Sequence, residues 1–160
     1  MTLTANYPIG IDCVWIAEDL QGMLAAFITA GMGPIPKFVI EDGDDLIHEL
    51  ENNLMRFPMV SAVHLHIDVP RPDDFISLAE RGFFVYDWRD AHCCSSLESI
   101  CYVRVASPEN AVNNSGLYLD ATRTLRVVHM RDIDFRASEY VGVSALENAV
   151  FPDDHTSQGL

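Results

Sequence analysis

Basic residues are scarce in this chain of 160 amino acids. Ten Lys and Arg residues stand against 24 Asp and Glu residues, Lys37 is the sole lysine, and the formal net charge is -14 at pH 7. Nucleic acids and anionic lipids are bound mainly through Lys and Arg, so this deficit argues against direct binding of DNA, RNA or a membrane surface. The same negative field attracts a basic protein and accelerates its association.

The sequence also lacks the short motifs that carry catalysis or nucleotide binding. It contains no P-loop and no GxGxxG, GxSxG or HExxH pattern. The acidic run EDGDD is not an EF-hand loop, because its glycine comes second counted from Asp42, instead of sixth, and the preceding segment is expected to be extended. We therefore expect a protein that is not an enzyme and has no cofactor.

Targeting segments and long apolar runs are missing as well. The start MTLTANYPIG has no charged region and no apolar core of a signal peptide, and the longest nearly uncharged run, MLAAFITAGMGPIP, is interrupted by glycine and proline. We expect a cytoplasmic protein with reduced cysteines. Cys13 and Cys101 sit in apolar, strand-like runs, whereas Cys93 and Cys94 are adjacent in a predicted loop.

The length and the 49% hydrophobic composition suit one compact domain. We assign residues 1–150 to a single globular α+β domain and residues 151–160 to a flexible C-terminal tail. The predicted architecture is a largely antiparallel sheet of about seven strands with two or three helices packed on it.

Hydrophobic periodicity places the strands of this sheet. A central hairpin is predicted for IDCVWIAEDLQGMLAAFITAG, because both of its apolar runs are nearly continuous. Residues 63–69 alternate between apolar and polar, which predicts a half-buried strand with one solvent-exposed face. Further strands are predicted for FFVYDW, SICYVRVAS, LYLDA and TLRVVHMRDIDF, the last being long enough to bend, and a short extended run is predicted for KFVIE.

Helical spacing predicts two amphipathic helices. One covers DDLIHELENNLM, and the other begins at Pro72 and the paired aspartates that follow it and ends at Gly82. A third, short helix is predicted near residues 138–148.

The stretch FVIEDGDDLIHELENN, residues 38–53, concentrates the negative charge. Six carboxylates lie between Glu41 and Glu51, with no lysine or arginine among them. Those at the start of the predicted helix, among them Asp42, Asp44 and Asp45, complement the helix dipole and cap its amides. Glu49 and Glu51 point outward without a counter-ion nearby in the sequence.

The best metal candidate is HLHID, where His64, His66 and Asp68 share one face of the predicted strand. Any solvent-facing strand shows the same alternation, and no HxxxH or CxxC motif completes a ligand set. The His92–Cys94 loop pairs a base with thiols, but neighbours in sequence seldom have catalytic geometry. An enzyme or a metal-binding protein using these residues is the alternative to a binding protein.

YDWRD, at residues 86–90, places aromatic and charged side chains at a strand end. Tyr, Trp and Arg often anchor protein interfaces, although Trp88 in the core at a strand terminus explains the pattern equally well. We expect the partner-binding residues to be Asp42, Asp44, Asp45, Glu49, Glu51, Asp87, Trp88 and Asp90.

The segment YPIGIDCVWIAEDLQGMLAAFITAGMGPIP, followed by an acidic helix and a small α+β sheet, resembles the bacterial immunity proteins encoded beside polymorphic or secretion-system toxins. The resemblance covers size, acidity and style over most of the chain. It implies an inhibitor that covers the active-site face of a basic toxin in the cytoplasm. The expected toxin is a nuclease, whose cationic groove an acidic inhibitor fills as a phosphate mimic, or another effector such as an ADP-ribosylating enzyme.

Overall fold

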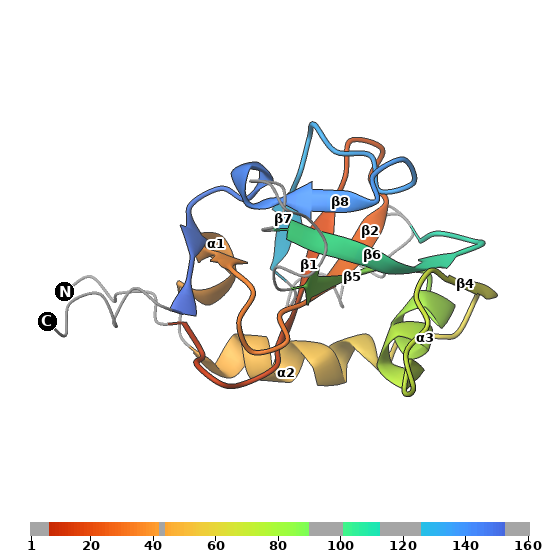
Figure 1. Cartoon of the computed structure of the whole chain (residues 1–160), viewed down its shortest axis with the longest axis horizontal. Coiled ribbons are helices and arrows are strands. Elements are labelled where there is room, and N and C mark those ends of the chain that lie inside the picture. Colours follow the sequence, from red (N-terminus) through yellow and green to blue (C-terminus); the bar gives the residue numbers. More distant parts are fainter. Residues whose placement is uncertain (1–6, 42–43, 90–100, 113–125, 153–160) are drawn as a thin grey trace, which may run out of the picture.

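The structure is a computed structural model that describes residues 7–41, 44–89, 101–112 and 126–152, with the side chains of residues 44–48 and 89 left out. A seven-stranded mixed sheet forms its centre, and three helices pack on this sheet (Figure 1). The predicted single α+β domain is confirmed. None of the helices within the described ranges is long and apolar enough to cross a bilayer.

The strand order in this sheet is β4-β6-β5-β2-β1-β7, and β8 pairs with the first half of β6. Within the described ranges, four pairs of neighbouring strands are antiparallel, whereas β1 with β7 and β2 with β5 are parallel. The sheet is therefore mixed with an antiparallel majority. The strands are β1 (Val14–Glu18), β2 (Leu24–Ile28), β4 (Val63–Leu65), β5 (Phe84–Arg89), β6 (Cys101–Pro108), β7 (Val127–His129) and β8 (Tyr140–Gly142).

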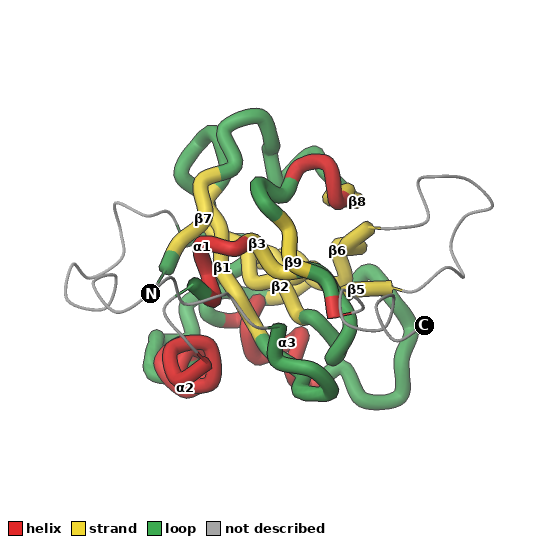
Figure 2. Tube along the Cα trace, turned by 90° about the vertical axis from the view of Figure 1, so that its left-hand side faces the viewer, coloured by secondary structure: helices red, strands yellow, loops and turns green. Residues whose placement is uncertain are grey.

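Two helices, α2 (Asp44–Leu54) and α3 (Asp73–Glu80), lie on the same side of the sheet (Figure 2). α2 contacts β1, while α3 contacts β4, β5 and β6. The short α1 (Lys37–Ile40) lies beside β7, next to a two-stranded sheet of β3 (Ile35–Pro36) and β9 (Ala149–Val150). A single 3-10 turn, η3 (Val143–Ala145), follows β8.

Aromatic side chains fill the other side of the central strands. Trp15 stacks on Phe27 with ring centroids 4.2 Å apart, and Phe27 stacks on Tyr86 at 4.9 Å. Phe135, from the segment after β7, covers Phe27 and Tyr86, and the Tyr86 hydroxyl donates to the carbonyl of Ser138. Both faces of β1 and β2 are thus buried, which explains their continuous apolar runs and confirms the predicted central hairpin.

A buried carboxylate joins this hairpin to the C-terminal segment. Asp19, only 5% exposed, directly follows β1 and accepts the amides of Gln21 and Met23 through Oδ1, each at 2.9 Å. Its Oδ2 accepts the amide of Phe135 at 2.9 Å. Asp19 is one of the 24 acidic residues of the chain, and its carboxylate has a structural role.

Several sequence predictions are confirmed. α2, β5 and β6 fall where the periodicity placed them, and α3 begins after Pro72 as its N-cap. Gly82 ends that segment with a φ of 94°, which favours glycine. Cys13 and Cys101 are buried, as expected.

Other predictions are wrong or incomplete. KFVIE is not extended, because Lys37–Ile40 form the one-turn helix α1, which buries the adjacent Val39 and Ile40 and leaves Lys37 and Phe38 exposed. The strand predicted for residues 63–69 ends at Leu65, ahead of two prolines that cannot continue a ladder, at positions 70 and 72. In the described part of TLRVVHMRDIDF, residues 126–135, only Val127–His129 form a strand.

The C-terminal part departs most from the predictions. Directly after β7 the chain turns at Met130, whose carbonyl accepts the amide of Ile133, so the long strand cannot continue. Residues 138–148 form β8 and a 3-10 turn in place of the third helix, and α1 is the third helix instead. LYLDA and the Cys93–Cys94 loop lie outside the described residues.

Candidate functional site

The outer face of α2 is the first candidate for a binding surface. Leu50 and Leu54 are buried against the sheet, whereas Glu49 and Glu51 are exposed. The predicted amphipathic helix thus presents these two glutamates outward. Asp42 and the side chains of Asp44 and Asp45 lie outside the described parts of the structure.

Glu51 belongs to a group of carboxylates from three separate segments. Asp12 precedes β1, Glu51 lies on α2, and Asp74 lies in the first turn of α3. Partial desolvation, followed by the charges of Asp74 and Asp12, raises the pKa of Glu51. Desolvation also raises the pKa of Asp12; Asp74 adds to this shift, and a hydrogen bond from the Ala30 amide, 2.9 Å from Oδ1, opposes it.

We call Asp12, Glu51 and Asp74 the acid cluster. All three side chains are exposed, and each lies within electrostatic reach of another member. Figure 1 shows the N-terminal loop alongside α2, with α3 beyond the C-terminal end of that helix. Only Glu51 was among the predicted partner-binding residues, because Asp74 was assigned to helix capping and Asp12 carries no signal in its own sequence neighbourhood.

The second predicted contact region, around Trp88, is partly core. Trp88 is half-buried at the end of β5, and its ring meets that of Tyr102 at a centroid distance of 5.1 Å. Its Cβ approaches Gly33 so closely that a Cβ there would lie 2.9 Å away. Asp87 is half-buried beside it, and Asp90 lies outside the described ranges. Trp88 therefore combines a packing role with partial exposure.

The predicted metal candidates project from the edge strand β4 and the residues after it. His64 Nε2 lies 3.2 Å from Oε1 of Glu109, and His66 Nε2 shares a 2.7 Å hydrogen bond with the Ser107 hydroxyl. Partial burial, then the charges of Arg104 and His64, lower the pKa of His66, while Glu139 opposes them. Asp68 is exposed.

Each histidine thus already has a side-chain contact in this structure. Among the described residues, no group of three or more His, Cys, Asp or Glu side chains is placed to hold a metal ion. His92, Cys93 and Cys94 lie outside those residues, so the alternative of an enzyme or a metal-binding protein stays a prediction.

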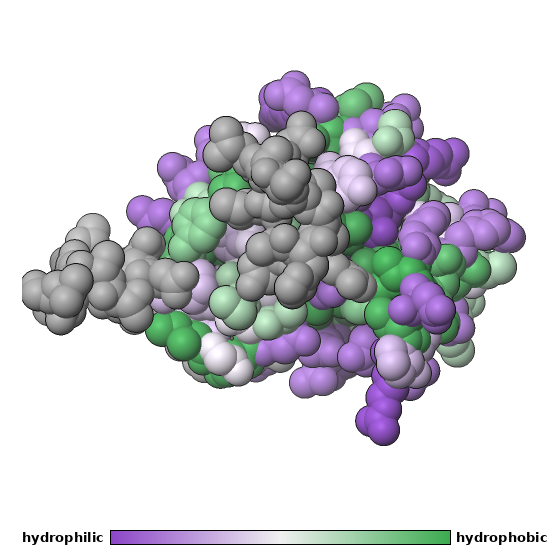
Figure 3. Space-filling model, in the orientation of Figure 1, coloured by the Kyte–Doolittle hydropathy of each residue, from purple (hydrophilic) through white to green (hydrophobic). Residues whose placement is uncertain are grey.

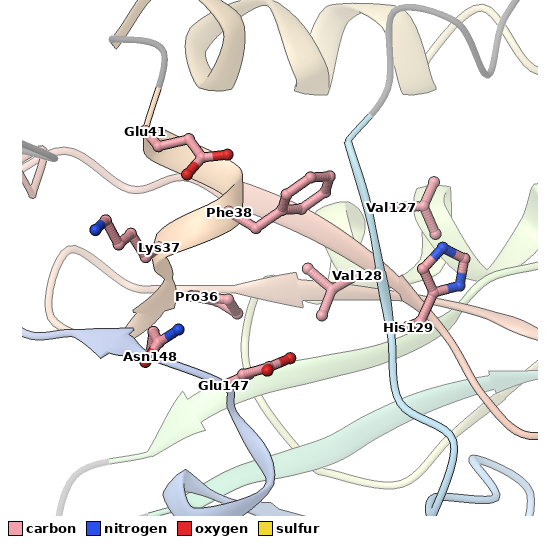
Figure 4. A pocket seen from close by; sticks show the side chains of 9 residues that line it. All are labelled: Pro36, Lys37, Phe38, Glu41, Val127, Val128, His129, Glu147 and Asn148. Atoms are coloured by element: carbon pink, nitrogen blue, oxygen red, sulfur yellow. The ribbon is translucent and has the colours of Figure 1, made fainter. Parts of the chain in front are cut away.

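A pocket of about 360 Å³ lies between α1, β7 and the turn before β9 (Figure 4). Lys37 points away from its centre, whereas Phe38 and the Glu147 carboxylate point toward it. The residues that line it are Pro36, Lys37, Phe38, Glu41, Val127, Val128, His129, Glu147 and Asn148.

Charges around this pocket are largely matched in pairs. Arg126 lies 3.4 Å from Glu41, stacks over the Phe38 ring at 5.2 Å and donates to the Phe38 carbonyl. His129 is paired with Glu18. The described lining contains no serine, threonine or cysteine that could serve as a nucleophile. The pocket therefore offers an apolar floor with polar edges, and the acid cluster is the stronger electrostatic feature.

Comparison with known proteins adds no functional assignment: no family model, no curated protein and no solved structure matches this chain.

Proposed function

We propose that this chain is an acidic binding protein that covers a cationic surface of a partner protein, acting as an immunity protein against a bacterial toxin. The observation that carries the proposal is the acid cluster, in which exposed carboxylates of three segments lie within electrostatic reach of one another. The chain as a whole adds a formal net charge of -14. A field of this sign steers a cationic protein toward the cluster.

Partial desolvation, and then the neighbouring carboxylates, raise the pKa values of Asp12 and Glu51, so the isolated protein disfavours their ionised forms. A basic partner stabilises the ionised carboxylates, so it lowers both pKa values and binding releases protons. Affinity should therefore decrease as the pH falls through the acidic range in which these two groups become protonated. It should also decrease as salt screens the exposed charges.

Bacterial immunity proteins offer a biological setting for such a surface. The proposed partner is a basic toxin that acts in the cytoplasm, a nuclease or another effector, and the proposed location of this protein is the same compartment. An acidic face that occupies a cationic substrate groove would block substrate access without catalysis or a cofactor.

Two variants of equal charge test this proposal. The first neutralises the acid cluster with Asp12→Asn, Glu51→Gln and Asp74→Asn; Asn at position 12 keeps an oxygen to accept the Ala30 amide. The second neutralises exposed carboxylates elsewhere, with Asp68→Asn, Asp132→Asn and Glu139→Gln. Each tagged protein is incubated with lysate of its native cells, and with the purified product of the neighbouring gene, at low and high salt.

The wild-type protein and the second variant should retain one basic protein in stoichiometric amount at low salt, and the acid-cluster variant should lose it. Co-expression of the wild-type protein should then restore growth to cells that produce the captured toxin. Equal capture by both variants would rule out the acid cluster as the contact surface. Capture of no protein by the wild type would overturn the proposal and return attention to His64, His66 and the pocket.

A further inference from the structure

An apolar patch lies next to the acid cluster. Ile9, Ile11 and Met32 are exposed by 60%, 45% and 52%, and we call these three residues the apolar patch. They belong to two turns that lie close together, since a Cβ added to Gly31 would lie 3.8 Å from the carbonyl carbon of Gly10. The patch is thus built by two segments that the fold brings together.

Asp12 connects this patch to the acid cluster. It follows Ile11 directly, and its carboxylate accepts the amide of Ala30 in the second turn, two residues before Met32. Figure 3 shows hydrophobic residues at the lower left, over the N-terminal loop, followed by hydrophilic residues along the lower edge, over α2. Apolar surface therefore borders acidic surface here.

We propose that the apolar patch is the anchor point of the partner interface, and that it receives an apolar side chain flanked by lysine or arginine on the partner protein. This inference rests on the proposed function. It adds to the interface an apolar contact from which water is excluded, which charged side chains alone do not supply. Binding free energy concentrates in apolar anchors surrounded by polar rims, while rim charges mostly set association rates.

Charge complementarity selects this occupant. A second copy of the chain would bring another net charge of -14 to an acidic rim, which opposes self-association. A second exposed apolar group, Met59 and Val60, follows Arg56 in the sequence. The Val60 amide donates to the carbonyl of Glu80, the residue before Arg81. That region lies outside the acid cluster and has arginines as sequence neighbours, so it serves as the control.

The test uses two synthetic peptides of equal positive charge as probes. In one, lysines flank a central leucine and tryptophan; in the other, serines replace the two apolar residues. Both are titrated into the full-length protein by calorimetry at low salt, using the wild type, an Ile9→Ser/Met32→Ser variant and a Met59→Ser/Val60→Ser control. The oligomeric state of each protein is measured by light scattering.

The wild type and the control variant should bind the apolar peptide about tenfold more tightly than the serine peptide. The Ile9→Ser/Met32→Ser variant should lose this preference while still binding both peptides through the acid cluster. Equal binding of the two peptides by the wild type would refute the apolar patch as an anchor point, while binding through the acid cluster would still be supported. Binding of neither peptide would contradict the proposed function as well, and a wild-type dimer abolished by the patch variant would assign the patch to self-association.

Discussion

Replacing Asp19 with alanine is the sharpest test of how the β1–β2 hairpin is joined to the segment after β7. The carboxylate is buried and accepts three backbone amides, from Gln21, Met23 and Phe135. Alanine removes all three acceptors and leaves the amides in place. The main-chain bond from the Asp19 amide to the Met23 carbonyl is retained, so the turn itself can still form.

The expected loss follows from where each amide lies. Phe135 is fully buried, so its orphaned amide cannot be rehydrated and costs about 1–3 kcal/mol. Gln21 is exposed and Met23 half-buried, so water can reach those amides and each lost bond costs about 1 kcal/mol. We expect Asp19→Ala to lower the free energy of unfolding by about 3–5 kcal/mol, a large part of the stability of a domain of this size.

Urea denaturation followed by circular dichroism measures this difference. Asp132→Ala is the matched control, because it removes the same charge from an exposed position and should change stability by less than about 0.5 kcal/mol. Asp19→Asn should fall between alanine and the wild type, since its amide oxygen can still accept hydrogen bonds. An Asp19→Ala protein within about 1 kcal/mol of the wild type would refute the structural role of this carboxylate.

Three further predictions concern packing and charge. Gly33→Ala places a Cβ 2.5 Å from the Tyr102 hydroxyl and 2.9 Å from Cβ of Trp88, so it should destabilise by about 1–3 kcal/mol and alter the near-ultraviolet dichroism of the tryptophan. Leu54→Ala empties a fully buried site beneath α2 and should cost about 2–5 kcal/mol in urea unfolding; a value below 1 kcal/mol would contradict the packing of that helix. Glu51→Gln should stabilise the protein at pH 7 by less than about 1 kcal/mol, because the raised pKa of Glu51 means that its ionised form is disfavoured in the fold and the exposed side chain is partly screened. That gain should vanish as the pH falls below the pKa of the unfolded glutamate, where both variants are neutral, and a gain independent of pH would show another cause.

Hydrophobic periodicity was sufficient where an element is decided by its own residues. The continuous apolar runs of β1 and β2 predicted a central hairpin, and the helical spacing of Leu50 and Leu54 predicted α2. The α+β class followed from the order of these elements. These predictions succeed because side-chain burial on a regular element repeats with the period of that element.

Long-range pairing decided the rest of the fold. Tyr140–Gly142 becomes a strand only because the edge of β6 is available opposite Cys101–Val103, and the predicted long strand ends at His129 because the following residues cover the aromatic face. Parallel pairing of β2 with β5 also depends on the path of the chain between them. Local sequence carries no record of such distant partners.

The candidate site divides in the same way. The sequence alone determined the strong negative charge and the outward placement of Glu49 and Glu51, because net charge needs only composition and helical periodicity fixes which side chains face water. It could not predict that Asp12 and Asp74 lie within electrostatic reach of Glu51. Nor could it predict that the turns carrying Ile9 and Met32 lie close together, next to the acid cluster. Electrostatic interaction depends on distance in space, so only the packing of the N-terminal loop, α2 and α3 made one surface from charges that lie far apart in the chain.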